Sequence, residues 1–568
     1  MIAHQSFFTR WVRFSPKLLI MLILVPVGAG LLGVLLPAFG WLPALGENTF
    51  NTKGFIALFN TPGFAAMALL SIVTSLLSTL IVVVVSCLML ASYFNSAFLG
   101  YIQRLLGPIL VIPHAAAAIA IGFLLAPSGF VMRLVSPWLT GTQQPPDILL
   151  PNDPYGFSII VGLVLKELPF ILLMALAAMQ QKEIKNSIDA HLMLARSLGY
   201  HPFTGFCKAV LPTLYPFMRL PIYAILAYSS ASIEIPLILG PNAPPTLAVA
   251  IMQWFNDVDL GLRIKASAGA VTQLFVTMFV LFLWWLFEKA VMFVAAPSFI
   301  NGRRSYADGV WRVLTHIVTL IILLSIVSAL VGLGLWSVAG YWSFPDALPE
   351  TLVSLHWQSA LTQISETLNN TLLVGFAAST IALLLTLFAL EAEQQRQKQL
   401  GVTISLIIYL PLLVPSIAFL FGIVWLKEQI GSASAMLYVI LGHLLFVLPY
   451  MFLTMATSYR KLDLRYAQVA ASLGCAPWRV FWSVKLPQLI VPMLFAYALG
   501  LAISFSQYLP TLLLGGGRID TLTTEAVALS SGASRRVTAV YVIMQFALPA
   551  FGFLLAWLIP KIVFRQRR

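Results

Sequence analysis

The chain has 568 residues, of which 60% are hydrophobic and only 9% are charged, with 33 Lys and Arg against 20 Asp and Glu. A soluble globular domain carries about 45–50% apolar and about 25% charged residues. This composition therefore excludes a cytosolic enzyme, a disordered chain and a secreted disulfide scaffold, and indicates a protein solvated mainly by lipid. Cys87, Cys207 and Cys475 form no CxxC pair, so we expect no disulfide framework, no metal site and no cofactor.

The chain begins with a long apolar run that follows Arg10, Arg13 and Lys17. The run exceeds the roughly 7–15 residues of a signal peptide's apolar region, so we interpret it as an uncleaved first span. A span needs about 20 apolar residues, and the sequence predicts twelve: 18–40, 64–92, 105–126, 157–179, 214–240, 266–296, 311–336, 367–390, 400–426, 434–457, 488–514 and 539–563.

Charge orients these spans. If the N-terminus is cytoplasmic, the inner segments hold 23 of the 33 basic residues and the outer loops hold eight. An excess of Lys and Arg marks cytoplasmic loops, so we expect both termini to be cytoplasmic. The net charge of +13 then reflects membrane orientation and does not indicate nucleic acid.

A repeat appears in the longest inner loop of each half, near 186–213 and near 460–488. Matched residues are 275 positions apart, as listed here: Ala195/Ala470, Ser197/Ser472, Leu198/Leu473, Gly199/Gly474, Pro202/Pro477, Phe206/Phe481, Leu211/Leu486 and Pro212/Pro487. The chain therefore reads as two parallel six-span halves, residues 1–300 and 301–568. Weaker echoes pair Leu110–Pro113 with Leu412–Pro415, and Ile235–Gly240 with Leu509–Gly515.

Each repeated loop predicts a helix, a turn and a second helix. Gly199 and Gly474 suit the position after a helix end, where a left-handed backbone favours glycine. Pro202 and Pro477 suit the first turn of the next helix. Such a helix can dock in a groove of another protein or lie on the lipid surface. Two copies at matching positions favour docking onto a partner with two-fold symmetry.

The repeated text resembles the "EAA" loop of binding-protein-dependent (type I) ABC importer permeases, above all the fused two-half permeases of the thiamine, ferric-iron and sulfate type. Ala470-Ala471-Ser472-Leu473-Gly474 carries the pattern, although Gln468 or Val469 stands at the Glu position, and Leu194-Ala195 departs further. Gly and Leu-Pro are kept in both copies. The resemblance covers essentially the whole chain.

The resemblance implies an all-α membrane protein of about 12 transmembrane helices in the bacterial inner membrane. It would translocate a small polar solute or ion inward, from a periplasmic binding protein, with two cytoplasmic ABC ATPase subunits docked on the loops. The coupling residues would be these: Ala195, Gly199, Pro202, Leu211, Pro212, Ala470, Ala471, Gly474, Pro477, Leu486 and Pro487. The chain has no Walker A motif, so we predict no catalytic residue and no enzyme activity in this chain.

Polar residues within the spans are candidates for a solute pathway. Ser230 and Glu234 lie in the fifth span, and Ser506, Gln507 and Tyr508 lie at a similar depth in the eleventh. The competing interpretation is hydrogen bonding between helices. Lys166 and Glu167 share the fourth span and have either a structural or a pathway role. His114, His316 and His443 are expected to be packing residues.

Two other functions stay open at this point. One is a 12-span ion-coupled secondary transporter, which also has two parallel halves but does not need a helical docking loop between the fourth and fifth spans of each half. The other is a membrane scaffold without transport, against which the polar fifth and eleventh spans argue. The sequence does not identify the solute, whether thiamine-like, ferric iron or anion.

Overall fold

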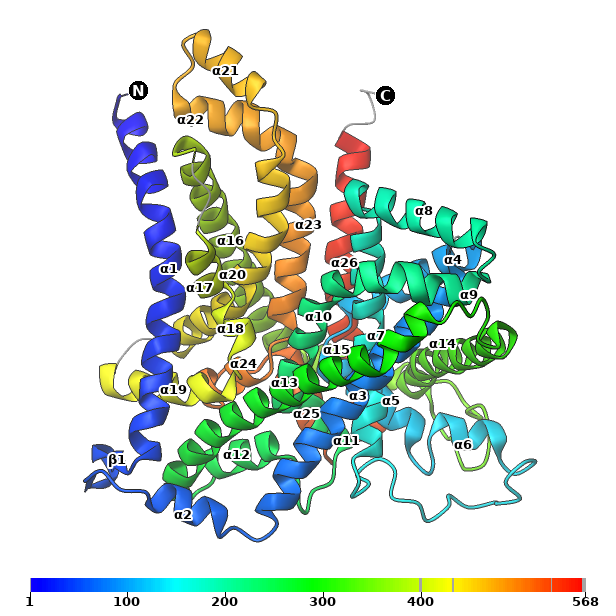
Figure 1. Ribbon diagram of the computed structural model, residues 1–568. Helices are drawn as coiled ribbons and strands as arrows, with labels where there is room; N and C mark the ends of the chain where they lie inside the picture. Colours follow the sequence, from blue (N-terminus) through cyan, green and yellow to red (C-terminus); the bar gives the residue numbers. More distant parts are fainter. Residues whose placement is uncertain (1, 95, 398–400, 432–433, 533, 564–568) are drawn as a thin grey trace. The chain divides into compact units, whose positions relative to one another are not determined.

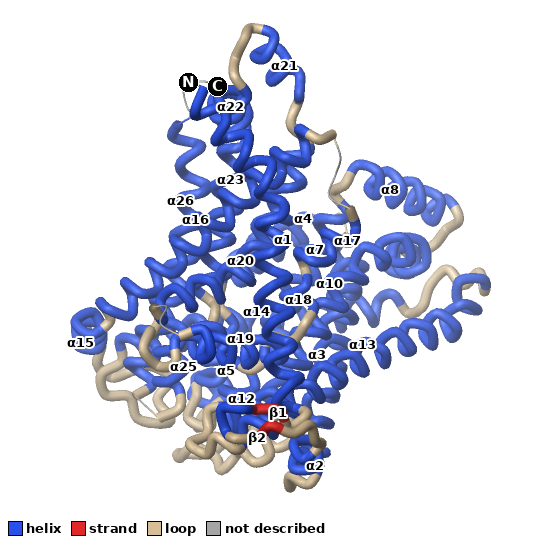
Figure 2. Tube along the Cα trace, turned by 90° about the vertical axis from the view of Figure 1, so that its left-hand side faces the viewer, coloured by secondary structure: helices blue, strands red, loops and turns tan. Residues whose placement is uncertain are grey.

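The protein is almost wholly helical. The computed structural model describes residues 2–94, 96–397, 401–431, 434–532 and 534–563, and 78% of the chain is helical. In these ranges the strands are β1 (Trp41–Leu42) and β2 (Glu47–Asn48), an antiparallel pair drawn in red in Figure 2. The predicted all-α fold is confirmed.

The chain forms two compact units, which do not coincide with the two halves of the sequence. Unit 1 comprises Met1–Leu36, Ala360–Ala528 and Tyr541–Arg568, and unit 2 comprises Pro37–Ser359 and Leu529–Val540. The first helix of the chain therefore belongs to the unit built mainly from the second half. The first helix of the second half, α14 (Asp308–Val338), belongs to unit 2 and packs on α3 and α5 there.

Unit 2 contains most of the helices of the first half (Figure 1). They are α2 (Lys53–Phe59), α3 (Phe64–Tyr93), α4 (Ala97–Leu106), α5 (His114–Leu125), α6 (Phe130–Val135), α7 (Phe157–Met179), α8 (Lys182–Ser197), α9 (Pro202–Gly205), α10 (Leu211–Ala231), α11 (Glu234–Leu239), α12 (Leu247–Phe255) and α13 (Leu262–Ile300). Helix α3 packs against α7, and α10 packs against α3, α7 and α13. Helix α15 (Leu355–Gln363) spans the boundary between the units.

Unit 1 contains α1 (Ile2–Ala38) and the later helices. They are α16 (Ser365–Gln395), α17 (Val402–Ile408), α18 (Leu410–Leu413), α19 (Ile417–Ile430), α20 (Ala435–Arg460), α21 (Leu464–Ser472), α22 (Pro477–Val480), α23 (Leu486–Phe505), α24 (Leu509–Gly515), α25 (Leu522–Ser530) and most of α26 (Arg535–Val563). Helices α16, α20 and α23 pack against one another.

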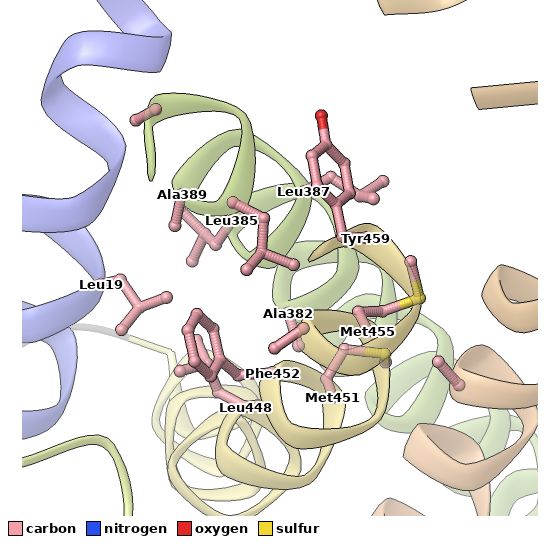
Figure 3. Packing of buried hydrophobic residues seen from close by; sticks show 14 of the residues in the cluster. Leu19, Ala382, Leu385, Leu387, Ala389, Leu448, Met451, Phe452, Met455 and Tyr459 are labelled. Atoms are coloured by element: carbon pink, nitrogen blue, oxygen red, sulfur yellow. The ribbon is translucent and has the colours of Figure 1, made fainter. Parts of the chain in front are cut away.

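A core of large apolar side chains holds unit 1 together. Leu19 of α1, Leu385 of α16 and Phe452 of α20 are buried in one cluster, and Figure 3 shows Leu19 facing the side chains of α16 and α20. Burying such a side chain fully contributes about 1.5–3 kcal/mol. In lipid, however, close packing rather than the hydrophobic effect holds the helices together.

Eleven helices among the described residues are long and apolar enough to cross a membrane, together with a shorter apolar stretch, Ala97–Val111. The predicted ninth span, 400–426, is not one continuous helix. Residue 400 lies outside the described ranges, and the rest divides into α17, α18 and α19. Pro411 and Pro415 explain the interruption, because proline lacks the N–H group that a helix interior requires.

The predicted third span is interrupted in the same way. Helix α4 passes into a tight turn, Gly107–Val111, and α5 begins only after Pro113. Ile112 and Val414, which precede the two prolines, both have extended backbones (φ −67°, ψ 124° and φ −91°, ψ 130°), as proline imposes on the residue before it. The two segments of similar sequence, Leu110–Pro113 and Leu412–Pro415, therefore interrupt their helices in the same way.

Candidate coupling loops and solute pathway

The two repeated loops have the same backbone turn. Leu198 and Leu473 end their helices, and Gly199 and Gly474 follow with φ of +76° and +80°. The N–H of each glycine donates to the third residue before it, and the next N–H donates to the fifth before it, at 2.9–3.1 Å. This is a Schellman turn, which satisfies carbonyls that the helix end leaves free.

Both loops then enter a long helix through a widened turn. Residues Phe206–Val210 and Phe481–Lys485 form π-helical turns, directly before α10 and α23. Pro212 and Pro487, the second residues of those helices, have no N–H, and their rings would clash with the carbonyl four residues earlier in a regular α-helix. One extra residue in the turn relieves that clash, as π-turns commonly do.

Large apolar side chains on each loop are exposed. Leu194 and Leu198 are 59% and 51% exposed, and the matching Val469 and Leu473 are 60% and 79% exposed. A spacing of four residues places each pair on one face of its helix. We call these four residues the apolar stripes. Exposed apolar side chains grouped in this way are typical of a binding surface.

The predicted coupling residues differ in exposure. Ala471, Gly474, Pro477 and Pro487 are exposed, as are Gly199, Pro202 and Pro212. Ala195 is buried, and its Cβ lies next to Gly205 of α9, while Ala470 and Leu211 are partly buried and Leu486 is buried. Ala195 therefore closes the first loop on itself and does not face outward.

The segment between α13 and α14 anchors the first loop. Asp308 accepts from the Thr204 N–H at 3.0 Å and from the Thr204 hydroxyl, and the Arg304 carbonyl accepts from the His201 N–H at 3.0 Å. Lys208 donates to the Asn301 side chain and the Arg303 carbonyl, both at 3.0 Å. We call residues 301–308 the inter-half segment. It binds the first loop at three residues, His201, Thr204 and Lys208.

A buried ion pair anchors the second loop instead. Lys485, in the widened turn, donates to both carboxylate oxygens of Glu391 on α16 at 2.7 and 2.8 Å, and Tyr459 of α20 donates to the same carboxylate. Close by on α16 and α20, Arg460 pairs with Glu393 at 2.7 Å. The turn is thereby tied to two long helices. A charge pair between helices in this position satisfies groups that burial would otherwise leave costly.

Sequence reasoning missed these anchors. Glu391 and Glu393 lie just beyond the predicted eighth span, and Asp308 and Lys208 lie in stretches rich in charge. Glu288 was also missed, although an acid inside the apolar run 266–296 is a signal for a partnered group. In the structure, Glu288 is buried and accepts from Arg219 at 2.9 Å and from Tyr215 at 2.7 Å.

The predicted pathway residues lie where helices break. In unit 2, α10 ends at Ala231, Ser232 is extended, and α11 begins at Glu234. Ser230 is buried and its hydroxyl lies 3.0 Å from that of Thr277 on α13, so it bonds between helices. Glu234 is only partly buried. The two residues share a helix junction but differ in accessibility.

Unit 1 has the corresponding break between α23 and α24. Ser506 and Gln507 are partly buried and Tyr508 is buried, and the Ser506 hydroxyl donates to the Ile503 carbonyl at 2.8 Å. Beside the break, His443 is buried and lies 2.7 Å from Ser504 and 2.8 Å from Thr511. It is a satisfied packing histidine. Within the described ranges, no group of three or more His, Cys, Asp or Glu residues is placed to hold a metal.

Each unit has one helix–turn–helix loop and helices long and apolar enough to cross a membrane, as expected for a transport permease. Residues 387–568 match the family described as binding-protein-dependent transport system inner membrane component. The chain is also 32% identical, over 421 residues, to the inner membrane ABC transporter permease protein YnjC of Escherichia coli (strain K12), across 72% of this chain and 73% of that protein.

Two further relatives match shorter regions. The putative 2-aminoethylphosphonate transport system permease protein PhnV of Salmonella typhimurium is 28% identical over 170 residues, 29% of this chain and 64% of PhnV. A spermidine/putrescine transport system permease protein PotC homolog of Mycoplasma genitalium is 26% identical over 188 residues, 31% of this chain and 64% of the homolog.

The chain belongs to the family of binding-protein-dependent ABC transporter permeases. It is a multi-pass inner-membrane protein, a fused two-half type I permease, and its family is one of transport proteins and not of enzymes.

Proposed function

We propose that this chain is the transmembrane permease subunit of an ABC importer. It accepts a small polar solute from a periplasmic binding protein and releases it into the cytoplasm. Two copies of a separate ATPase subunit, one on each repeated loop, hydrolyse ATP and drive the change of access. Both termini are cytoplasmic in this proposal, because the positive charges gather on that side.

The observation that carries the proposal is the duplicated loop. Both copies present exposed apolar stripes at a helix end that a Schellman turn closes, and both loops are anchored, the first to the inter-half segment and the second to α16 through Lys485 and Glu391. A docked partner covers the stripes, and the anchored loops transmit its movement to the spans. A secondary carrier has no use for such a pair.

The test replaces the apolar stripes with charge. Leu194→Asp/Leu198→Asp alters the first loop and Val469→Asp/Leu473→Asp alters the second. A buried Leu contributes about 1.5–3 kcal/mol, and each 1.4 kcal/mol is tenfold in affinity. Each double variant should therefore lose at least tenfold in ATPase binding, measured by quantitative pull-down of the tagged chain in mild detergent.

Val258→Asp is the matched control, because Val258 is 98% exposed on the connection between α12 and α13, away from both loops in sequence. It should recover about two ATPase copies per chain, as the parent does. Full ATPase recovery with all four stripe residues replaced would contradict the proposal, as would uptake that follows the proton or sodium gradient without ATP.

A further inference from the structure

Unit 2 contains a polar pair, His114 and Glu167, whose facing atoms are buried and have no hydrogen-bond partner. Glu167 of α7 is 7% exposed. Its Oε1 atom and the Nδ1 atom of His114, at the start of α5, are both shielded and unbonded, and they lie 3.9 Å apart. Buried polar atoms are almost always hydrogen-bonded, so each exception needs an explanation. Packing within unit 2 does not explain why these two atoms have no hydrogen-bond partner.

The neighbouring lysine does not neutralise this carboxylate through a direct bond. The Lys166 ammonium donates instead to the carbonyls of Ile109, Leu110 and Ile112, at 3.3, 3.4 and 2.5 Å. These three carbonyls use all three of its donors. Lys166 is thus committed to the helix break at Pro113, and the Glu167 oxygen stays available.

The histidine is placed as a recognition group. Its ring packs against that of Tyr228 of α10, with centroids 4.6 Å apart and the planes tilted by 33°, and 33% of its side chain is exposed. Ionisable side chains within spans face the bundle interior or a water-filled cavity and seldom face lipid. Because Nδ1 faces Glu167, the carboxylate favours a proton on Nδ1, and Nε2 is left as an acceptor.

Unit 1 provides an internal comparison. Its buried histidine, His443, uses both ring nitrogens in hydrogen bonds with Ser504 and Thr511. A histidine that only packs can therefore be fully satisfied in this chain. His114 is not, although it also lies at a helix break. The unbonded Nδ1 atom therefore distinguishes His114 from His443.

We propose that His114 and Tyr228, with Glu167 behind them as a positioning residue, form a solute subsite for an organic cation with N–H donors. This inference rests on the proposed import function and adds the class of solute. Nε2 accepts a hydrogen bond from the cation, and the aromatic faces attract its charge. Two acids, Glu167 and Glu234, against the single Lys166 give these residues a formal charge of −1, which favours a cation over an anion.

The test measures binding to the purified full chain in nanodiscs by thermal shift, because a ligand that binds only the folded state raises the melting temperature. The probes are ethanolamine, putrescine, spermidine and thiamine, with sulfate and phosphate as anionic comparators. At least one cation should give a saturable rise, and neither anion should. Glu167→Gln and His114→Ala should each weaken the response at least tenfold, while Tyr228→Phe should keep it.

His316→Ala is the matched control, since His316 is an exposed histidine on α14, and it should leave the response unchanged. If Glu167→Gln fails to fold, Tyr228→Leu replaces it as a variant without the aromatic ring beside His114. A response to anions alone, an unchanged response in the His114 variant, or no response to any cation from a chain that still binds its ATPase would overturn the inference. That last result would leave the proposed import function intact, whereas loss of ATPase binding by the parent chain would remove both.

Discussion

Lys166 shows at the level of one residue how the chain keeps a charge among apolar helices. Pro113 interrupts a helix and frees carbonyls, and the ammonium bonds to three of them. The lysine needs acceptors and the break needs donors, because unpaired polar groups in lipid cost several kcal/mol each. The break and the charge therefore stabilise each other.

The sequence identified Lys166 and Glu167 as unusual but could not assign their partners. The acceptors for Lys166 are backbone carbonyl oxygens. Because every residue has a carbonyl group, residue type does not indicate which ones accept. Only the break at Pro113 makes them available. The sequence similarity between Leu110–Pro113 and Leu412–Pro415 indicated where the helix breaks. It did not indicate that a lysine on a helix 50 residues later binds the carbonyls that the break frees.

The Lys485–Glu391 pair leads to a stability prediction. Lys485→Met leaves a buried carboxylate without its cation, which costs about 3–5 kcal/mol in such sites. Lys485→Met/Glu391→Leu removes both charges and should recover most of that loss. We expect the melting temperature in detergent to fall clearly in the single variant and to return close to the parent value in the double variant.

Lys53→Met is the control for removal of a lysine, since Lys53 is exposed at the start of α2. If the double variant were as unstable as the single one, the ion pair would not be the source of the effect, and the packing of α16 on α23 would have to explain it.

At the level of elements, glycines set how closely α1 approaches α19 within unit 1. A Cβ on Gly33 would lie 2.8 Å from the Gly422 backbone, and a Cβ on Gly422 would lie 1.8 Å from the Gly30 carbonyl oxygen. No real Cβ contact is that short, so only glycine fits at this crossing. Small residues allow such close backbone approach between membrane helices.

This crossing predicts a difference in stability between alanine variants of the glycines at the contact and of a glycine outside it. Gly422→Ala and Gly33→Ala should force α1 away from α19 and lower the melting temperature, by an amount typical of overpacking, about 1–3 kcal/mol. Gly28→Ala should not, because nothing lies within 4 Å of its Cβ position. Thermal denaturation followed by size-exclusion chromatography measures the difference. Equal stability of the Gly28 and Gly422 variants would contradict the packing.

The repeat allowed the two helix–turn–helix loops to be predicted in detail. It did not predict the close crossing of α1 and α19. Gly199, Pro202, Gly474 and Pro477 act through local backbone rules, so their spacing alone predicts a helix, a turn and a helix. Gly30, Gly33 and Gly422 act through a partner hundreds of residues away. Their spacing is compatible with contacts on several faces of each helix, and the sequence does not show which face meets the partner helix.

At the level of the whole molecule, the inter-half segment is more than a tether between two halves. It contributes Asp308, Arg304 and Asn301 to the turn of the first loop. Among the described residues, the second loop is anchored by the Lys485–Glu391 ion pair. Two loops of one design are thus anchored by different means.

A change at Asp308 should therefore act on one loop only. In the parent chain, the two carboxylate oxygens of Asp308 accept hydrogen bonds from Thr204, Ser305 and Tyr306. Asp308→Asn leaves only one acceptor oxygen, so part of this set of hydrogen bonds is lost. We expect faster amide hydrogen exchange in residues 201–210 and unchanged exchange in 476–485, with about half of the ATPase recovered. Asp147→Asn, at an exposed position, is the control. Equal exchange of the first loop in both variants would show that the segment is a passive linker.

The membership of α1 in unit 1 also determines the order in which the protein can be assembled. Its residues are synthesised before its partners in Ala360–Ala528, which follow about 300 residues later. At about 5–20 residues per second, the helix waits roughly 15–60 s in the membrane. Nearly all of unit 2 leaves the ribosome during that interval. The mean hydropathy of α1, 2.7 over its most apolar window, suits this delay, because it keeps a lone helix inserted until the chain that completes its unit arrives.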